Sequence, residues 1–175
     1  SLTLINQRGL SKIYNPMMAL AVLEVLRKNG HEAYLTMVGP ESDGSLNACK
    51  DAAEQKGLDV KFTGLLSKAE WIRLAEQSNV FMNTTNVDNT PVSVIEAMAL
   101  GLPVVSTNVG GMPYLIEDEV DGLLVQPNKP KAMATAIMRL KEDSKLRQTL
   151  IINARKKVEQ FDWIVVKTQW QALLS

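Results

Sequence analysis

The chain alternates short apolar, β-branched runs with longer segments of helical periodicity, and this alternation restricts its fold more than any other feature. The runs expected to form strands are residues 2–6, 33–38, 60–63, 80–83, 103–106 and 122–125. The segments expected to form helices are 16–28, 45–56, 68–77, 91–100, 112–117, 129–142, 144–160 and 162–174. Such a pattern predicts an α/β fold, in which a parallel sheet of about six strands is covered by helices on both faces.

Two halves of three strands each predict a Rossmann-like, doubly wound sheet with strand order 3-2-1-4-5-6 and a helical C-terminal tail. In that order the first and fourth strands are neighbours. Ligands bind beyond the carboxyl ends of the strands at the point where the order reverses, so loops 7–15 and 84–90 are expected to form a crevice. Because no Gly/Ser-rich linker divides residues 1–175, we expect a single domain.

The charge and cysteine content exclude several classes of function. Nineteen basic and nineteen acidic residues give a net charge of zero, so no overall field favours a nucleic-acid partner. Cys49 and His31 are the only residues of their types, which excludes an internal disulfide and a zinc site made of Cys and His alone. The apolar runs are too short to span a bilayer. We expect a cytoplasmic setting and, because Ser1 is followed almost at once by a strand, a fragment of a longer protein.

Thr90 and Pro91 predict the start of a helix. A hydroxyl residue is favoured at the N-cap, and proline is favoured at the first helical position, where its missing N–H costs nothing. The free backbone N–H groups of Val92 and Ser93 should therefore point into the crevice. Together with the helix dipole they would form a site for phosphate, although every helix has such an end.

Glu96 is a carboxylate in a helix that is otherwise apolar on nearly every side. At about 100° per residue, only Ser93 and Glu96 are polar, and they lie about 60° apart around the axis. A helix that is apolar all round is buried, so Glu96 must be hydrogen-bonded, paired or facing a cleft. It could accept hydrogen bonds from a ribose diol, or it could cap the N–H groups of a neighbouring loop. The helix alone leaves both interpretations open.

The loop after the first strand carries Arg8, Gly9 and Lys12. Two cations and a glycine opposite a helix N-terminus would suit a diphosphate, because the cations supply charge and glycine permits close backbone approach. Exposed loop cations are common, so the motif also fits an ordinary surface loop. Asp88, in the second loop, could orient ligand hydroxyls or form an Asx-turn.

Glycines follow two further strands. Gly39 lies in "VGP" after the second strand, and Gly110 and Gly111 lie in "NVGG" after the fifth. Glycine permits a positive φ and can present N–H groups to a ligand, or it can simply make a turn. The basic cluster "ARKK", which ends at Lys157, has no glycine loop or interleaved aromatic residues, so we interpret it as a solvated helix face.

The segment "DNTPVSVIEAMALGLPVVSTNVGGMPYLIEDEVDGLLV", residues 88–125, closely resembles the signature of a known family. The family is that of the C-terminal, nucleotide-sugar-binding domains of retaining GT-B glycosyltransferases (glycosyl transferases group 1, family 4-like). The resemblance extends more loosely to the whole chain through the Arg8 loop, "VGP", "VKFTGLL" and the helical tail after "FDW". It implies a Rossmann-like half of a two-domain enzyme.

The resemblance also implies roles for single residues. Glu96 matches the acid that binds the donor ribose, and Asp88 matches the acid at the donor sugar. Arg8 matches the arginine that binds the diphosphate, with Lys12 as a substitute for the family lysine. The segment whose amides approach the sugar and phosphates comprises Asn89, Thr90, Pro91 and Val92. The segment that cradles the base comprises Thr63, Gly64, Leu65 and Leu66.

The chain departs from the family pattern in three places. Asp88 replaces a glutamate, Tyr14 and Asn15 occupy the place of the usual lysine and glycine, and Tyr114 stands where glutamate is usual after Gly-Gly-x-Pro. Donor preference and activity are the properties that these departures would change.

The resemblance implies transfer of a sugar, with retention of configuration, from a nucleoside-diphosphate donor to a glycan or lipid acceptor. Catalysis would be chiefly electrostatic, with no metal and no cofactor apart from the donor substrate. An N-terminal domain would supply the acceptor site, and the protein would work in the cytoplasm or at the inner face of the membrane. The apolar tail could pack on that domain or in this domain's own core. A sugar-nucleotide epimerase and a non-catalytic nucleotide-binding module are the alternatives.

Overall fold

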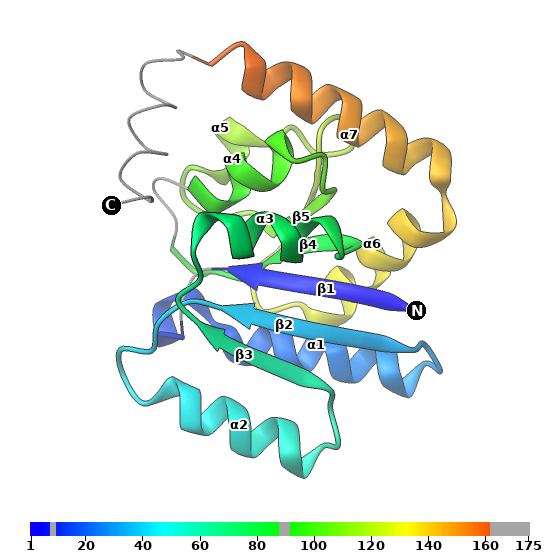
Figure 1. Ribbon diagram of the computed structural model, residues 1–175. Helices are drawn as coiled ribbons and strands as arrows, with labels where there is room; N and C mark the ends of the chain where they lie inside the picture. The colour runs from blue at the N-terminus through cyan, green and yellow to red at the C-terminus, as the bar shows by residue number, and fades with distance from the viewer. Residues whose placement is uncertain (8–9, 88–91, 162–175) are drawn as a thin grey trace.

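The computed structural model describes residues 1–7, 10–87 and 92–161. Its six strands are β1 (Leu2–Gln7), β2 (Ala33–Val38), β3 (Val60–Gly64), β4 (Val80–Asn83), β5 (Val104–Thr107) and β6 (Leu123–Val125). They form one parallel sheet in the order β3-β2-β1-β4-β5-β6 (Figure 1). The predicted fold class and strand order are therefore confirmed.

Helices cover both faces of this sheet (Figure 1). They are η1 (Lys12–Tyr14), α1 (Pro16–Lys28), α2 (Ser45–Gln55), α3 (Lys68–Glu76), α4 (Val92–Ala99), α5 (Met112–Leu115), α6 (Pro130–Glu142) and α7 (Ser144–Glu159). Buried side chains of α1, α2 and α6 form one core against the sheet, and those of α3, α4 and α5 form a second core on the opposite face. Helix α7 contributes Leu150 to the first core and Ala154 to the second. The predicted tail helix, 162–174, lies outside the described residues.

The two cores follow from the alternation of side chains along each strand. In β1, Leu2 and Leu4 belong to the core under α1, whereas Ile5 belongs to the core under α3 and α4. Because helices cover both faces, central strands are buried on both sides, and every residue of β4 and of β5 is buried. Strand sequences such as "VFMN" and "VVST" are therefore apolar at the start and polar only where the strand reaches the carboxyl edge of the sheet.

Helix α3 is held at a defined place beside this edge. Ser67 and Glu70 form a capping box, in which each side chain accepts a hydrogen bond from the other residue's backbone N–H, at 3.2 and 3.3 Å. One turn further on, Trp71 is only 2% exposed and meets the ring of Phe81 edge-on at 6.0 Å. The cap and the buried indole together fix both the start and the rotation of α3.

The basic cluster on α7 differs from the expectation. Lys157 forms an ion pair with the buried Asp121 and donates to the carbonyl oxygen of Leu115 at 2.8 Å. Arg155 donates to the carbonyl oxygen of Leu100. The interpretation as a solvated face is wrong for Lys157, which is half-buried, because tertiary packing supplies acceptors that the sequence spacing does not reveal. Arg155 is exposed, as predicted. Within the described part of the chain, no helix is both long and apolar enough to cross a membrane.

Candidate functional site

The loops that follow β1 and β4 are joined directly at the carboxyl edge of the sheet. The backbone N–H of Asn86 donates to the carbonyl oxygen of Ile13 at 3.0 Å. The hydroxyl of Thr84 donates to the carbonyl oxygen of Asn15 at 3.1 Å. The two loops that the strand order selects are thus side by side, as predicted from the sequence.

A buried polar network lies beneath these loops. The Asn6 side-chain amide donates to Thr84 Oγ1 at 3.2 Å, and Thr107 Oγ1 donates to the carbonyl oxygen of Thr85 at 2.6 Å. All four residues are buried. Buried polar groups with satisfied hydrogen bonds hold one arrangement, so the floor of the crevice is rigid. Sequence reasoning did not single out this network, although polar residues at the ends of apolar strands are a signal for it.

Glu96 is 1% exposed on α4, and it forms an ion pair with Lys68, the first residue of α3. The side chain of Lys68 is itself only 14% exposed. The requirement that Glu96 be paired or face a cleft is therefore met in both ways, because Glu96 also lines a small cavity.

This cavity, which we call the carboxyl-edge cavity, has a volume of about 100 Å³. Its lining consists of Gln7, Val38, Leu65, Leu66, Ser67, Lys68, Trp71 and Glu96. These residues come from the carboxyl ends of β1, β2 and β3 and from helices α3 and α4. Gln7 Oε1 is buried and has no hydrogen-bond partner among the described residues, so an acceptor at the edge of the cavity is left for a ligand or for water.

The glycines of the site are partly brought together. Gly39 and Gly64 both have positive φ, 129° and 69°, and the N–H of Gly39 donates to the carbonyl oxygen of Gly64 at 2.9 Å. Leu65 follows and is 78% exposed, so it does not belong to the core. Gly110 has φ 53°, but Gly111 has φ −80°, which any residue can adopt. Their contact with a ligand stays a prediction.

Lys12 is an exposed residue in the loop after β1, and Asp43 fixes its backbone. The Lys12 N–H donates to Asp43 Oδ2 at 2.8 Å, while the Ser11 and Ser45 hydroxyls also donate to this carboxylate. These hydrogen bonds hold the pKa of Asp43 below its ordinary value, and the one from the Lys12 N–H has the largest effect. Asp43 thus ties the first loop to the start of α2, a role that sequence reasoning missed.

Several predicted site residues lie outside the described residues: Arg8, Gly9, Asp88, Asn89, Thr90 and Pro91. Val92 is the first residue of α4, and it is half-buried. Tyr114, the departure from the family pattern after Gly-Gly-x-Pro, is 93% exposed on α5. Within the described ranges, no three side chains of His, Cys, Asp or Glu lie together so that they could hold a metal ion.

Lys68 is the main site residue that sequence reasoning missed. The Ser-x-x-Glu pattern at Ser67–Glu70 could have placed Lys68 at the start of a helix beside the crevice. That pattern gives no direction for the side chain. Only the packing of α3 against α4 brings it to Glu96, 28 positions further along the chain.

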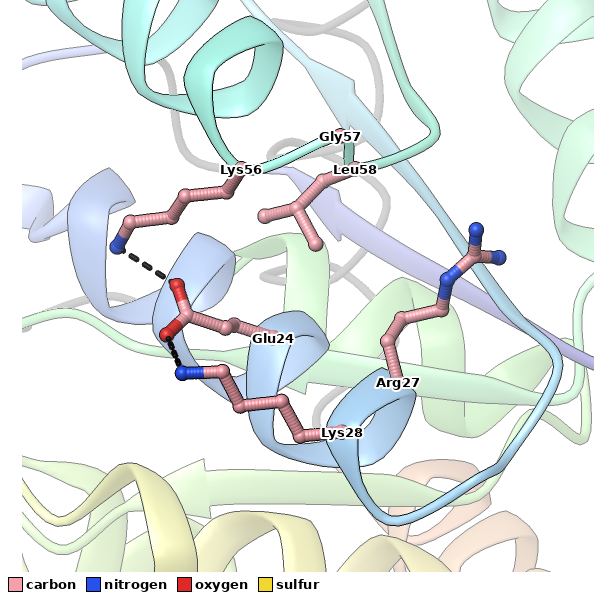
Figure 2. Close-up of a pocket in the computed structure, with 6 residues that line it drawn as sticks. All are labelled: Glu24, Arg27, Lys28, Lys56, Gly57 and Leu58. Atoms are coloured by element: carbon pink, nitrogen blue, oxygen red, sulfur yellow. Dashed lines mark hydrogen bonds and ion pairs between the residues drawn. The ribbon is translucent and has the colours of Figure 1, made fainter.

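A larger hollow, of about 350 Å³, lies at the opposite end of the sheet, where α1 and α2 end (Figure 2). Figure 2 shows Glu24 between Lys28 and Lys56, each ammonium 2.8 Å from a carboxylate oxygen. Arg27 points away from this group and pairs with Asp59 at 3.1 Å. The charges of the hollow are thus engaged with one another, and it lies away from the edge at which ligands bind doubly wound sheets.

Comparison with known proteins gives a consistent result. A family model described as glycosyl transferases group 1 matches residues 3–157. The amylovoran biosynthesis glycosyltransferase AmsK of Erwinia amylovora is 31% identical over 150 residues, which are 81% of this chain and 36% of AmsK. The chain therefore spans about a third of the length of that relative.

Two solved structures share the fold. HepE from Anabaena, in complex with UDP-glucose, has a TM-score of 0.84 and 23% identity, over 99% of this chain and 48% of that chain. The C-terminal domain of the glycosyl transferase group 1 protein LpcC from Francisella tularensis has a TM-score of 0.78 and 23% identity, over 91% of this chain and 85% of that one. At this level of identity, both comparisons show that the fold is shared.

Proposed function

Because the chain belongs to the glycosyl transferases group 1 family, we propose that its crevice binds a nucleoside-diphosphate sugar and that the protein transfers the sugar to a glycan or lipid acceptor. The observation that carries this proposal is Glu96, a carboxylate 1% exposed that lines the carboxyl-edge cavity. A buried acid at that edge is suited to a neutral, hydroxyl-rich ligand group, because a carboxylate accepts strong hydrogen bonds from a diol.

The nucleoside is proposed to lie across the ends of β1, β2 and β3. Glu96 accepts hydrogen bonds from the ribose hydroxyls, and the segment from Gly64 to Leu66 lies along the base. The exposure of Leu65 and the unpartnered Gln7 Oε1 support this placement. The complex of HepE with UDP-glucose supports a nucleotide sugar as the donor class.

The diphosphate is proposed to lie at the start of α4. The backbone N–H groups there, including those of Val92 and Ser93, point out of the helix end and favour an anion. Arg8, with Gly9 beside it, and Lys12 add positive charge, and Asp88 lies at the donor sugar. As the bond from the sugar to the diphosphate breaks, these groups stabilise the developing negative charge, so that the acceleration is chiefly electrostatic and needs no metal.

The acceptor is proposed to approach from the part of the protein that lies outside this chain. The chain spans 36% of AmsK and 48% of HepE, so the remainder can supply the N-terminal domain that completes the site. Transfer would retain the configuration of the sugar, with the leaving phosphate accepting the proton of the attacking hydroxyl. We place the protein in the cytoplasm or at the inner face of the membrane, in polysaccharide biosynthesis, for which AmsK is named.

A binding experiment on the full-length protein tests the donor site. Thermal-shift measurements with UDP-, GDP- and ADP-sugars identify the base, and calorimetry then compares the wild type with Glu96→Gln, which keeps the shape and removes the charge. We expect the variant to bind at least about fivefold more weakly, the scale of one lost charged hydrogen bond. Unchanged affinity in a folded variant would remove the ribose assignment.

An activity assay on the same protein tests the reaction. Release of nucleoside diphosphate that depends on an added glycan or lipid acceptor is the expected result. A donor whose sugar changes configuration without any acceptor would instead indicate an epimerase. Binding of the donor without any release would indicate a nucleotide-binding module.

A further inference from the structure

Lys68 is placed to act on the nucleotide site through Glu96. Its ammonium pairs with Glu96 Oε2, and both residues line the carboxyl-edge cavity. The carboxylate side chain is 2% exposed and the lysine side chain 14% exposed, so bulk water solvates neither charge fully. Screening is weak at such a place, and the pair is a strong interaction rather than a surface contact.

The backbone that carries Lys68 is held on both sides. Ser67 precedes it as the N-cap of α3 and forms the capping box with Glu70. Trp71, one turn further on, is buried against Phe81 and lines the same cavity. The start of α3 therefore cannot turn without breaking the cap or exposing the indole. The direction of Lys68 toward α4 is built into the packing of the helix.

We propose that Lys68 is a positioning residue for the nucleotide: it orients Glu96 so that the carboxylate accepts hydrogen bonds from the ribose hydroxyls. This inference rests on the function proposed above, and it adds a residue and a role to that site. With Oε2 held by the ammonium, Oε1 is the oxygen that meets the diol. Lys68 is thus expected to determine how strongly the protein selects ribose over deoxyribose.

The physical reason lies in the burial of Glu96. A buried carboxylate that loses its ammonium partner turns toward other hydrogen-bond donors. A carboxylate that has turned away no longer meets the ribose hydroxyls with good geometry. The 2′-hydroxyl therefore contributes less to binding once Lys68 has been removed, even though Lys68 need not touch the nucleotide.

A comparison of ribonucleotides with deoxyribonucleotides measures this coupling. Calorimetry on the full-length protein would use three pairs of probes, which are UDP with 2′-deoxy-UDP, GDP with 2′-deoxy-GDP and ADP with 2′-deoxy-ADP. For the pair that binds, we expect the wild type to prefer the ribonucleotide by about tenfold, the scale of a hydrogen bond to a charged group. In Lys68→Met the preference should fall to about twofold, and Lys68→Arg, which keeps the charge, should restore most of it.

The chain offers a matched control in its second buried acid–lysine pair. The Asp121 side chain is 3% exposed and pairs with Lys157, and neither residue lines the carboxyl-edge cavity. Lys157→Met also removes a lysine from a buried carboxylate, so it reports the general loss of stability. It should leave the ribose preference at the wild-type value. Loss of preference in Lys157→Met would show that the effect of Lys68→Met is not local.

Each result of the binding measurements either supports or contradicts the role of Lys68. If Lys68→Met does not fold, Lys68→Gln, an uncharged side chain that can still donate, is measured in its place. A folded Lys68→Met or Lys68→Gln variant that keeps the full ribose preference overturns the role of Lys68 and leaves the proposed function intact. If the wild type binds one of the pairs but shows no preference, the ribose assignment of Glu96 fails, and the role of Lys68 fails with it. If the wild type binds none of the six probes, the proposed donor site itself fails.

Discussion

At the scale of single residues, the chain contains two buried carboxylates that are each paired with a lysine. Glu96 and Asp121 are both nearly fully buried acids, and each is neutralised by a lysine from another helix, Lys68 or Lys157. The two pairs differ in their surroundings. Glu96 lines a cavity, whereas Asp121 also accepts a hydrogen bond from the backbone N–H of Glu117 at 2.9 Å. The second pair therefore serves the loop before β6, and the first is available to a ligand.

Removal of the second acid should cost stability. Asp121→Ala leaves Lys157 without its carboxylate and the Glu117 N–H without its acceptor, so we expect the free energy of unfolding to fall by about 2–4 kcal/mol. Urea denaturation measures this free energy of unfolding. Glu54→Gln, an exposed position on α2, is the control and should change the stability by less than about 0.5 kcal/mol. An equal, small effect of both substitutions would contradict a structural role for the pair.

At the scale of elements, loops rather than helices decide the geometry of the crevice. The loop after β1 is tied to the loop after β4 by Asn86 and Thr84, and it is tied to the loop after β2 by Asp43. Lys12 lies in the middle of this arrangement, so its backbone position depends on three strands rather than on one. A loop fixed on both sides can present a cation to a phosphate without the entropy cost of ordering it first.

The stability that the hydrogen bonds to Asp43 contribute should decrease at low pH. Hydrogen bonds to its carboxylate lower the folded-state pKa below the ordinary value of 3.8. The stability contributed by ionised Asp43 is therefore complete above the unfolded-state pKa, and it is lost as the pH falls through the folded-state pKa. Urea denaturation of the wild type and of Asp43→Asn should differ more at neutral pH than at a pH of about 3. Asp51→Asn, at an exposed position on α2, is the control. A difference in stability between the wild type and Asp43→Asn that stays constant with pH would rule out this contribution.

At the scale of the whole molecule, the two ends of the sheet differ in chemistry. The hollow at the amino end is lined by ion pairs of Glu24 with Lys28 and Lys56 (Figure 2). The carboxyl end holds joined loops, positive-φ glycines and a cavity with a buried carboxylate. This asymmetry is expected of a doubly wound sheet, because only at the carboxyl edge do loops from both halves meet.

A substitution at the amino end tests where function lies. Glu24→Gln removes the charge that holds Lys28 and Lys56 together, yet it leaves the crevice untouched. We expect nucleotide affinity to stay within about twofold of the wild type in calorimetry, since salt screens the interaction between a site and a charge that lies more than a Debye length away. A decrease as large as that expected for Glu96→Gln would place the ligand in the larger hollow instead.

The sequence by itself determined the six parallel strands, their order, the edge at which a ligand is expected and the need of Glu96 for a partner. These expectations follow from the periodicity of apolar residues, from the rules for crossover connections and from the free-energy cost of burying a charge. Each of them can be judged from the spacing of residues along the chain. Only the tertiary structure decided which lysine meets Glu96, that Asp43 holds the backbone of Lys12, and that Lys157 is paired rather than solvated. Contacts between side chains of different elements depend on how helices rotate and pack against the sheet, and no spacing along the chain specifies that rotation.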